Sequence, residues 1–380
     1  MVQNPRLKGL PMAVAGNELK RNGVILTASY EARKYGIKAG MSNRDALMLC
    51  PNLIMVPPRM KLYKKYSNKV MNLLRQYTYK VEQFSIDEAW VDISDMLYGK
   101  HTPQSIAFEI KERIKYEIGV TVSIGISYNK IIAKLASDIA DRDSIYEINE
   151  YKFKTKIWKR PVKEMMGVGS KTNEKLKSMN IITIEDMAKA DITLIKAILK
   201  KPGEVLWQHA NGIDKSPVNY ESSFPKSIGN SHTAIKDIKN MYGAKKMLLL
   251  ISEQVGCRLR KYKATATVVS ITVKTNDFKS YTRQRTIQGG ICTTKRIYKE
   301  AINLLKENWK EDIPIRLLGI SLSGIQYYEQ QLSFSSLMGE SEVKDEIIDK
   351  IIDETNLKYN KILITRATIL DSHKIYTKPD

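Results

Sequence analysis

Two adjacent acidic residues, Asp87 and Glu88, are the best candidates for chemistry in this sequence. They lie where two runs rich in apolar residues meet, Val81–Ile86 and Ala89–Ile93, and these runs predict two strands joined by a turn. Each carboxylate at such a turn can direct an oxygen toward a hard cation, and Mg²⁺ prefers few carboxylates together with substrate phosphates. A polar β-turn that binds nothing is the alternative interpretation of an isolated Asp-Glu pair.

The remaining residue types exclude several other classes of site and of protein. Cys50, Cys257 and Cys292 form no Cys-x-x-Cys pair, and the four histidines never occur at metal-ligand spacing, so any catalytic metal is expected on carboxylates. No apolar run approaches the roughly 18 residues of a membrane span. The amino terminus has no extended apolar segment for secretion, and the sequence therefore predicts a cytoplasmic protein with no membrane segment.

The balance of charge favours nucleic acid as the partner. The 380 residues include 62 Lys and Arg against 41 Asp and Glu, a formal net charge of +21, which suits a polyanion. Residues 226–330 hold 19 basic and 8 acidic residues, whereas residues 331–380 hold 7 and 9. A solvated basic surface is the alternative for any single cluster, but an excess spread over two large parts of the chain favours an extended track for a polyanion.

The segment that follows the acidic pair has the periodicity of an α+β unit. Isoleucine recurs at every fourth position from Ile106 to Ile118, which predicts a helix, and Val120–Ile126 alternates apolar with polar residues, which predicts a strand. A second helix over Asn129–Ile139 and a strand over Ile145–Ile148 complete the unit. Such sheets carry helices on one face and leave the other face free to receive a substrate.

Two further modules follow. Gly167 and Gly169 flank one residue between two predicted short helices, and this pattern resembles a helix-hairpin-helix, whose backbone amides can face a phosphate without reading sequence. A plain helix-helix turn is the alternative. After a linker at residues 217–225, alternation from Val269 to Val273 predicts a strand between two helical segments. This second α+β unit carries the excess of basic residues.

Three motifs in the right order resemble the Y-family translesion DNA polymerases. The string from Phe84 to Ala89 is similar to that family's Ser-Ile-Asp-Glu-Ala motif, Thr27–Lys38 to its nucleotide-binding stretch, and Ser123–Lys130 to its third palm strand. The resemblance implies an α+β, multi-domain right-hand fold with palm, fingers and helical thumb, plus an α+β little finger. It implies the following division: residues 1–60 fingers, 61–157 palm, 158–222 thumb, 226–330 little finger and 331–380 tail.

The same resemblance implies the residues of an active site. Asp87 and Glu88 would be ligands of two Mg²⁺ ions in the palm, and Thr27, Tyr30 and Arg33 would contact the incoming deoxynucleoside triphosphate. The chemistry fits, because arginine offers a forked set of donors to phosphate oxygens and the two hydroxyls add further donors. Two metal ions stabilise both the attacking and the leaving oxygen in phosphoryl transfer.

Further residues are implied in contacts to DNA and to a sliding clamp. The DNA contacts would be non-specific contacts to phosphates, made by Gly167, Gly169, Lys171, Arg283 and Arg285. A short peptide beyond the little finger resembles a sliding-clamp-binding motif, through Gln331, Leu332 and Phe334. Its aromatic residue comes one position earlier than in the commonest form, and a plain strand end is the alternative.

The sequence departs from the family pattern at its beginning. Family members start with a strand that carries an Asp-x-Asp pair and then an aromatic residue that excludes ribonucleotides, ahead of the point matching Asn4, and neither is present. The palm sheet beside Asp87 would then keep unpaired backbone groups, each costing about 1 to 3 kcal/mol if buried. A start codon assigned too late and a degraded remnant are both open explanations, and we favour the first.

A second departure lies after the predicted helix Asn129–Ile139, where the family supplies a lysine to the triphosphate. Here Asp141, Arg142 and Asp143 follow Ala140. Arg142 could substitute after a shift of one residue, but the two aspartates would oppose a triphosphate, so we count none of them as site residues.

The leading hypothesis is a monomeric, low-fidelity polymerase that extends a DNA primer past template damage, using Mg²⁺ and deoxynucleoside triphosphates. One rival is a catalytically impaired protein that binds primer-template DNA and the clamp without incorporating nucleotides. The other is a basic fold in which the Asp87-Glu88 turn binds nothing.

Overall fold

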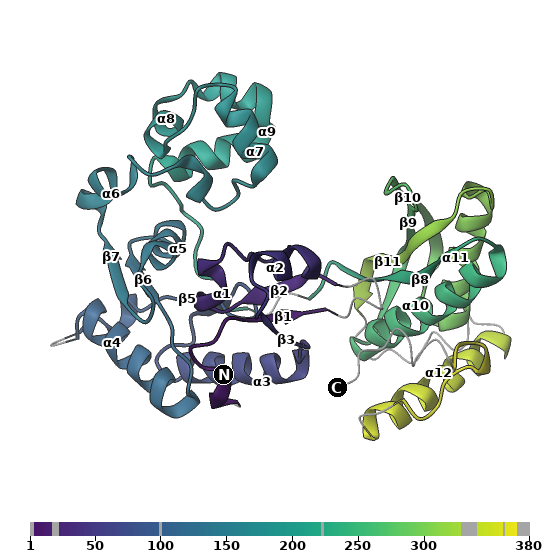
Figure 1. The fold of residues 1–380 in the computed structure, drawn as a ribbon. Helices are drawn as coiled ribbons and strands as arrows, with labels where there is room; N and C mark the ends of the chain where they lie inside the picture. Colours follow the sequence, from purple (N-terminus) through teal and green to yellow (C-terminus); the bar gives the residue numbers. More distant parts are fainter. Residues whose placement is uncertain are drawn as a thin grey trace. The chain divides into compact units, whose positions relative to one another are not determined.

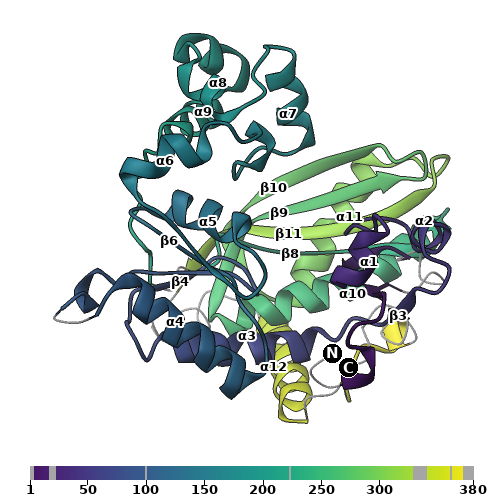
Figure 2. The ribbon, with the colours of Figure 1, turned by 60° about the vertical axis from the view of Figure 1, so that its left-hand side comes forward.

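The computed structural model describes residues 4–16, 23–98, 101–221, 224–327, 340–359 and 362–370 (Figure 1 and Figure 2). The chain divides into two compact units, one of Met1–Lys8 with Arg59–Ser222 and one of Gly9–Pro58 with Ser223–Asp380. Among the described helices, none combines the length and the apolar character that crossing a membrane requires.

The first unit begins with a helical layer that packs on the hairpin of the acidic pair. Its elements are α3 (Met60–Leu74), β4 (Val81–Gln83), β5 (Ala89–Val91), α4 (Pro103–Arg113) and a π-helical turn (Ile114–Ile118). Thr102 and Ser105 form a capping box at the start of α4, and Gly119, with φ of 82°, ends the helical segment. Buried side chains of α3 and of the predicted isoleucine face pack together in one core, which confirms that helix.

A parallel βαβ unit follows, with β6 (Ile124–Ser127), α5 (Lys130–Ile139) and β7 (Ile145–Ile148). Asn129 caps α5 by accepting a hydrogen bond from the amide of Ile132 at 3.0 Å. A Cβ on Gly125 would lie 2.0 Å from the carbonyl oxygen of Ala133, so this close approach of strand to helix requires glycine. The strand is shorter than predicted, because β6 begins only at Ile124.

The four strands of this region form two separate sheets instead of the single predicted sheet. In the described part of the chain, β5 pairs only with β4, and β6 pairs only with β7. Between the two sheets lies a cavity of about 460 Å³, lined by residues of β5, β6, α3 and α4. The edges of β5 and β6 that have no strand partner both contribute to this lining.

A helical group completes the first unit (Figure 1). It contains α6 (Glu150–Ile157), a 3-10 turn (Val162–Glu164), α7 (Ser170–Lys177), α8 (Ile184–Lys189) and α9 (Ile192–Ala210). Gly167, just ahead of α7, has φ of +90°, a conformation that favours glycine. The buried residues of this group share one core with those of α5.

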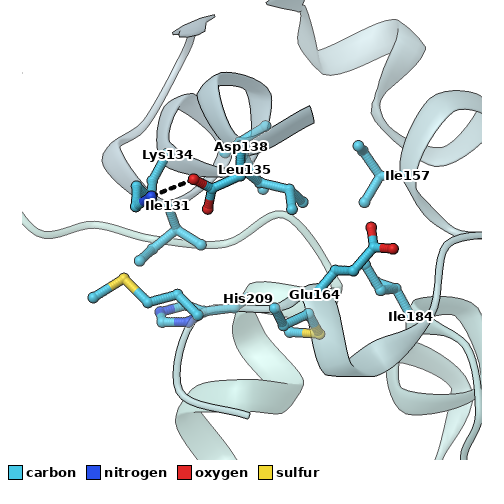
Figure 3. Close-up of a pocket in the computed structure, with 11 residues that line it drawn as sticks. Ile131, Lys134, Leu135, Asp138, Ile157, Glu164, Ile184 and His209 are labelled. Carbon is cyan, nitrogen blue, oxygen red and sulfur yellow. Dashed lines mark hydrogen bonds and ion pairs between the residues drawn. The ribbon is translucent and has the colours of Figure 1, made fainter. Parts of the chain in front are cut away.

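A cavity of only about 10 Å³ lies where α5 meets this helical group (Figure 3). It is lined mainly by apolar side chains, together with Lys134, Asp138, Glu164 and His209, and it has room for one water molecule at most. Within the described residues, His209 Nδ1 has no hydrogen-bond partner. Burial lowers the pKa of His209, and the nearby carboxylate of Asp214 opposes this shift.

The second unit contains a small three-stranded sheet near the amino terminus. Its strands are β1 (Met12–Ala15), β2 (Ile25–Ala28) and β3 (Ile54–Val56), in the order β2-β1-β3, with β1 antiparallel to β2 and parallel to β3. Helices α1 (Tyr30–Lys34) and α2 (Asn43–Leu49) accompany it, and both are capped by a serine side chain.

The carboxyl-terminal part of the second unit is an antiparallel sheet with two helices along one face (Figure 2). The strands are β8 (Ser227–Ile238), β9 (Ala264–Thr275), β10 (Ser280–Ile291) and β11 (Ile315–Tyr327), in the order β10-β9-β11-β8. Helices α10 (Met241–Lys261) and α11 (Thr294–Asn308) bury their apolar residues against Val269, Ile271 and Val273. The predicted α+β character of this region is confirmed.

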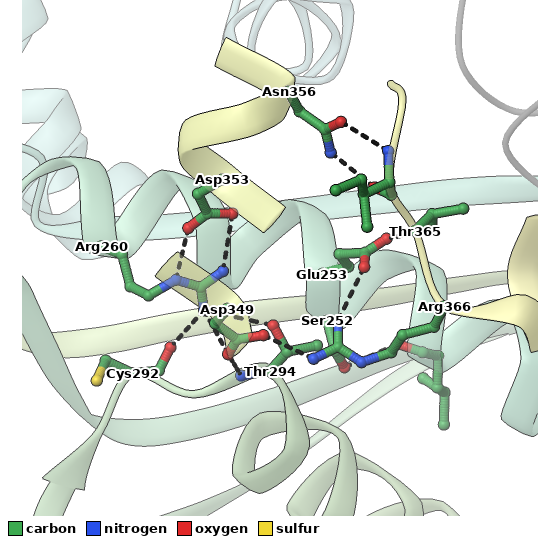
Figure 4. A network of polar contacts seen from close by, with 12 residues as sticks. Ser252, Glu253, Arg260, Cys292, Thr294, Asp349, Asp353, Asn356, Thr365 and Arg366 are labelled. Atoms are coloured by element: carbon green, nitrogen blue, oxygen red, sulfur yellow. Dashed lines mark hydrogen bonds and ion pairs between the residues drawn. The ribbon is translucent and has the colours of Figure 1, made fainter. Parts of the chain in front are cut away.

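The tail helix α12 (Glu340–Lys358) is joined to this sheet domain by buried ion pairs (Figure 4). Asp349, only 1% exposed, lies 3.0 Å from Arg260 Nη1 and 2.6 Å from Arg366 Nη2. It also accepts a hydrogen bond at 2.7 Å from the amide of Thr294, the first residue of α11. Asp353 accepts hydrogen bonds from Nε and Nη2 of Arg260, at 2.7 and 3.1 Å.

We expect Asp349→Ala to destabilise the sheet domain by about 3 kcal/mol, because it removes the buried carboxylate that Arg260 and Arg366 share and the cap of α11. Hydrogen exchange of the α11 amides in the full chain measures this. Glu354→Ala, which removes only an exposed pair with Lys350, is the matched control and should change protection by less than about 0.5 kcal/mol. Equal protection in the two variants would contradict a structural role for the network.

The half-buried position of His209 predicts a pH dependence of stability. Because its folded pKa lies below the ordinary value of 6.5, its contribution is complete above that pH and is lost as the pH falls toward the lowered value. The protection factors of the α9 amides, which are corrected for the intrinsic slowing of exchange at lower pH, should therefore decrease between pH 7.5 and 5.5 in the wild type and decrease less in His209→Leu. The same pH slope in both proteins would refute this assignment.

Candidate active site

The turn between β4 and β5 brings Asp87 and Glu88 together around one hydroxyl group. Ser85 Oγ lies 2.7 Å from Asp87 Oδ1 and 3.2 Å from Glu88 Oε2. The amides of Phe84 and Ser85 both donate to the carbonyl of Glu88, at 3.0 and 3.2 Å, which closes the turn. Gln83 Nε2 donates to the carbonyl of Ser85 at 3.0 Å. The two carboxylates are therefore positioned by the turn itself.

Helix α5, which packs on the sheet of β6 and β7, also makes polar contacts with this hairpin. Trp90 Nε1 donates to the carbonyl of Lys130 at 2.9 Å, and Lys130 Nζ lies 2.8 Å from Glu82 Oε2. One turn later, Lys134 Nζ lies 2.9 Å from Glu88 Oε1. Burial alone would lower the pKa of Lys134, but the carboxylates of Asp138 and Glu88 hold it above its ordinary value. The sequence did not single out Lys134, because this contact joins residues far apart in the chain.

The acidic pair fits a hard divalent cation that has further ligands from elsewhere. Asp87 is exposed and Glu88 is half-buried, and both line the cavity of about 460 Å³. In the described ranges, no group of three or more His, Cys, Asp and Glu side chains is arranged to hold a metal ion. Two carboxylate oxygens with room for phosphate and water are the donor set typical of Mg²⁺.

The three candidates for triphosphate contacts lie together at the end of β2 and on α1. Thr27 is an exposed residue of β2, and Tyr30 and Arg33 are exposed on α1. Arg33 Nε donates to the carbonyl of Ala28 at 3.1 Å, and its guanidinium carbon lies 5.2 Å from the centre of the Tyr30 ring. These residues belong to the second unit, whereas the carboxylate pair belongs to the first.

In the loop after α5, one of the two aspartates that were expected to oppose a triphosphate is paired with lysines. Asp143 adopts φ of 57°, and its carboxylate lies 3.0 Å from Lys115 Nζ and 3.7 Å from Lys111 Nζ. The hydrogen bond from Lys115 is the main cause of the lowered pKa of Asp143. The negative charge of this residue is therefore offset by two lysines of the α4 segment.

The glycines of the predicted helix-hairpin-helix lie at the start of α7. Gly169 is the N-cap of α7 and provides no side-chain cap, so the first amides of the helix lack a capping side chain. A Cβ on Gly169 would meet nothing within 4 Å. Lys171 is the second residue of the helix and is exposed. Amide groups and an ammonium at a helix start favour an anion.

The two arginines of β10 point toward the helical face of their sheet. Arg283 pairs with Ile271 and Arg285 with Val269, and directly paired residues share one face. Arg285 Nη2 lies 2.7 Å from Glu307, and Arg283 Nε donates to Asn308 at 3.0 Å, so both contact α11. Their contacts to template phosphates stay a prediction.

The other face of this sheet carries small hydroxyl residues that sequence reasoning did not select. The strand register places hydroxyl, glycine and amide residues side by side on it: Ser231, Ser270, Thr272, Thr282, Gln284, Gly319 and Ser321. The signal was present in the alternation of residues 269–274, in which each apolar residue is followed by a polar one. The predicted clamp-binding residues Gln331, Leu332 and Phe334 lie outside the described residues.

Models of three protein families match the chain. Residues 1–138 match the impB/mucB/samB family, residues 225–334 match the C-terminal domain of that family, and residues 163–214 match the thumb domain of DNA polymerase iota.

Curated relatives and solved structures agree with these matches. The chain is 40% identical over 382 residues to the DNA polymerase IV of Clostridium kluyveri, covering 98% of this chain and 95% of that protein. It is 36% identical over 380 residues to DNA polymerase IV 1 of Bacillus subtilis, covering 100% of this chain and 91% of that protein. A Y-family polymerase chimera of Dbh and Dpo4 covers 86% of this chain and 95% of its own, with TM-score 0.76 and 27% identity. An insertion ternary complex of Dbh DNA polymerase matches the same shares with TM-score 0.61 and 26% identity.

These matches extend over nearly the whole chain and agree with the α+β architecture, the thumb helices and the antiparallel little finger sheet. They confirm the resemblance first seen in the residues around the acidic pair. The chain therefore belongs to the Y family of DNA polymerases, among the translesion enzymes of the DNA polymerase IV type.

Proposed function

We propose that the palm hairpin holds two Mg²⁺ ions through Asp87 and Glu88 during nucleotide addition. The convergence of both carboxylates on Ser85 Oγ, at 2.7 and 3.2 Å, carries this proposal. When bound, the ions supply stabilisation of charge on the attacking 3′ oxygen and the leaving pyrophosphate. The protein contributes a turn that holds the two carboxylates before any cation arrives.

Thr27, Tyr30 and Arg33 would hold the triphosphate of the incoming deoxynucleotide. Arg33 is oriented by the carbonyl of Ala28 and by the Tyr30 ring, so its remaining donors lose little freedom when they meet phosphate oxygens. Thr27 and Tyr30, exposed residues of the adjacent elements β2 and α1, would add two hydroxyl groups.

The thumb and the little finger would bind primer-template DNA through its phosphates. The start of α7, with Gly167, Gly169 and Lys171, offers amides and a positive charge, and the little finger adds Arg283 and Arg285 at the rim of its sheet. The small side chains on the hydroxyl-rich face of that sheet would let a phosphate backbone approach closely. We further propose a monomer that acts in the cytoplasm and binds a sliding clamp through residues 331–334.

One observation favours a second candidate, a DNA-binding protein with impaired catalysis. In the described part of the palm, the turn of the hairpin offers two carboxylates, and β5 and β6 leave a cavity between unpaired edges. We propose that a further extended strand between β5 and β6 would join the two sheets and supply an additional carboxylate beside Asp87. Without such a strand, DNA binding would remain while nucleotide addition would be slow.

Replacing the two carboxylates, and extending the chain upstream, distinguishes the two candidate functions. In primer extension with Mg²⁺, we expect the double variant Asp87→Ala and Glu88→Ala to lose at least about 100-fold in rate, while its affinity for primer-template changes by less than about twofold. The assay includes the chain as given and a version extended upstream by an Asp-x-Asp strand. No incorporation by the extended version would refute the polymerase proposal for this hairpin, and incorporation only by the extended version would support the second candidate.

The salt dependence of DNA binding tests the phosphate contacts. We expect Lys171→Ala and Arg283→Ala each to reduce the slope of log affinity against log salt by roughly one, because each releases one fewer counterion. Arg285→Ala should change the slope less, because Glu307 and Glu300 already neutralise this arginine. Fluorescence anisotropy of a labelled primer-template at several salt concentrations measures the slopes, and identical slopes for all variants would exclude these contacts.

A further inference from the structure

Lys134 occupies the side of Glu88 that Ser85 leaves open. Its ammonium lies 2.9 Å from Glu88 Oε1, and the side chain is only 17% exposed. The other carboxylate oxygen, Glu88 Oε2, lies 3.2 Å from Ser85 Oγ. Both oxygens of this carboxylate therefore have a partner within the protein.

The position of Lys134 has opposite effects on the empty and the loaded site. Next to Asp87 and Glu88, an ammonium offsets the repulsion between two adjacent negative charges. A divalent cation on Glu88 would instead lie close to that ammonium, and the two positive charges would repel each other across a partly desolvated site. A cation that binds Glu88 must therefore move Lys134 away from Oε1.

The structure provides a second acceptor for the displaced ammonium. Asp138 lies one helical turn after Lys134, and its carboxylate is an ion-pair partner of the same nitrogen (Figure 3). Asp138 is 51% exposed, so it can hold the ammonium at the helix surface. Lys134 can leave Glu88 without losing all its partners.

We propose that Lys134 is a resident counter-cation of the acidic pair, which moves entirely to Asp138 when a divalent cation binds. Lys134 is then a positioning residue that keeps Glu88 in place before the metal arrives and competes with the metal for it. This inference rests on the proposed metal site at Asp87 and Glu88, and it assigns a role to two residues outside that site.

The same helix supplies a matched control. Lys130, one turn before Lys134, makes an equivalent ion pair with Glu82 at 2.8 Å and is 14% exposed. Glu82 belongs to β4 and is not one of the paired carboxylates. Replacing Lys130 therefore removes a comparable ion pair between α5 and the hairpin without touching Glu88.

The test is Mn²⁺ binding to the free chain at low salt, followed by electron paramagnetic resonance, with no DNA or nucleotide present. We expect Lys134→Met to bind Mn²⁺ about tenfold more tightly than the wild type. Lys130→Met should stay within about twofold of the wild type. Asp138→Asn should bind more weakly, because Lys134 then has only Glu88 as a partner. Thermal melting of each variant establishes that it is folded.

The outcomes separate this inference from the proposed metal site. Unchanged or weaker binding by Lys134→Met overturns the counter-cation role, and so does the absence of binding by both that variant and the wild type. Binding by Asp138→Asn equal to that of the wild type removes the role of Asp138 as second acceptor. If the double variant Asp87→Ala and Glu88→Ala binds Mn²⁺ as the wild type does, the proposed metal site itself is wrong.

Discussion

The metal site that we propose depends on holding two adjacent carboxylates together in a folded protein. Two negative charges so close together repel each other. The hydroxyl of Ser85, which contacts both carboxylates, and the ammonium of Lys134, which contacts Glu88, reduce this repulsion. Both partners come from elements that are themselves anchored, the closed turn and helix α5. The hairpin that carries Asp87 and Glu88 is thus stabilised by side-chain contacts as well as by the backbone hydrogen bonds between its two short strands.

Helix α5 has a wider role than its length suggests. It packs on β6 and β7, shares a core with the thumb helices, and donates side chains to the hairpin from the other sheet. Because the palm strands form two separate sheets in the described residues, this helix provides polar links between them. The close fit of Gly125 against the helix backbone leaves no space for a larger residue there and fixes the position of the lysines.

Much of the fold and of the hairpin followed from sequence, because periodicity and turn chemistry are local. The isoleucine face of α4 and the strand alternation in β9 are confirmed. Other features could be identified only from the three-dimensional structure. The partner of Glu88 lies 46 residues away in sequence, and the face on which Arg283 and Arg285 lie depends on register, since a shift of one residue exchanges the two faces of a strand. The pairing of Asp143 with lysines of the α4 segment is likewise a tertiary contact.

The carboxylate of Asp349 shows that the little finger does not end where its family model ends, at residue 334. A side chain from α12 caps the first turn of α11 and neutralises Arg260 inside the domain. A chain shortened to residue 334 would therefore lose both carboxylates that neutralise the Arg260 guanidinium. Helix α12 is therefore a structural element of this domain and part of its core of ion pairs.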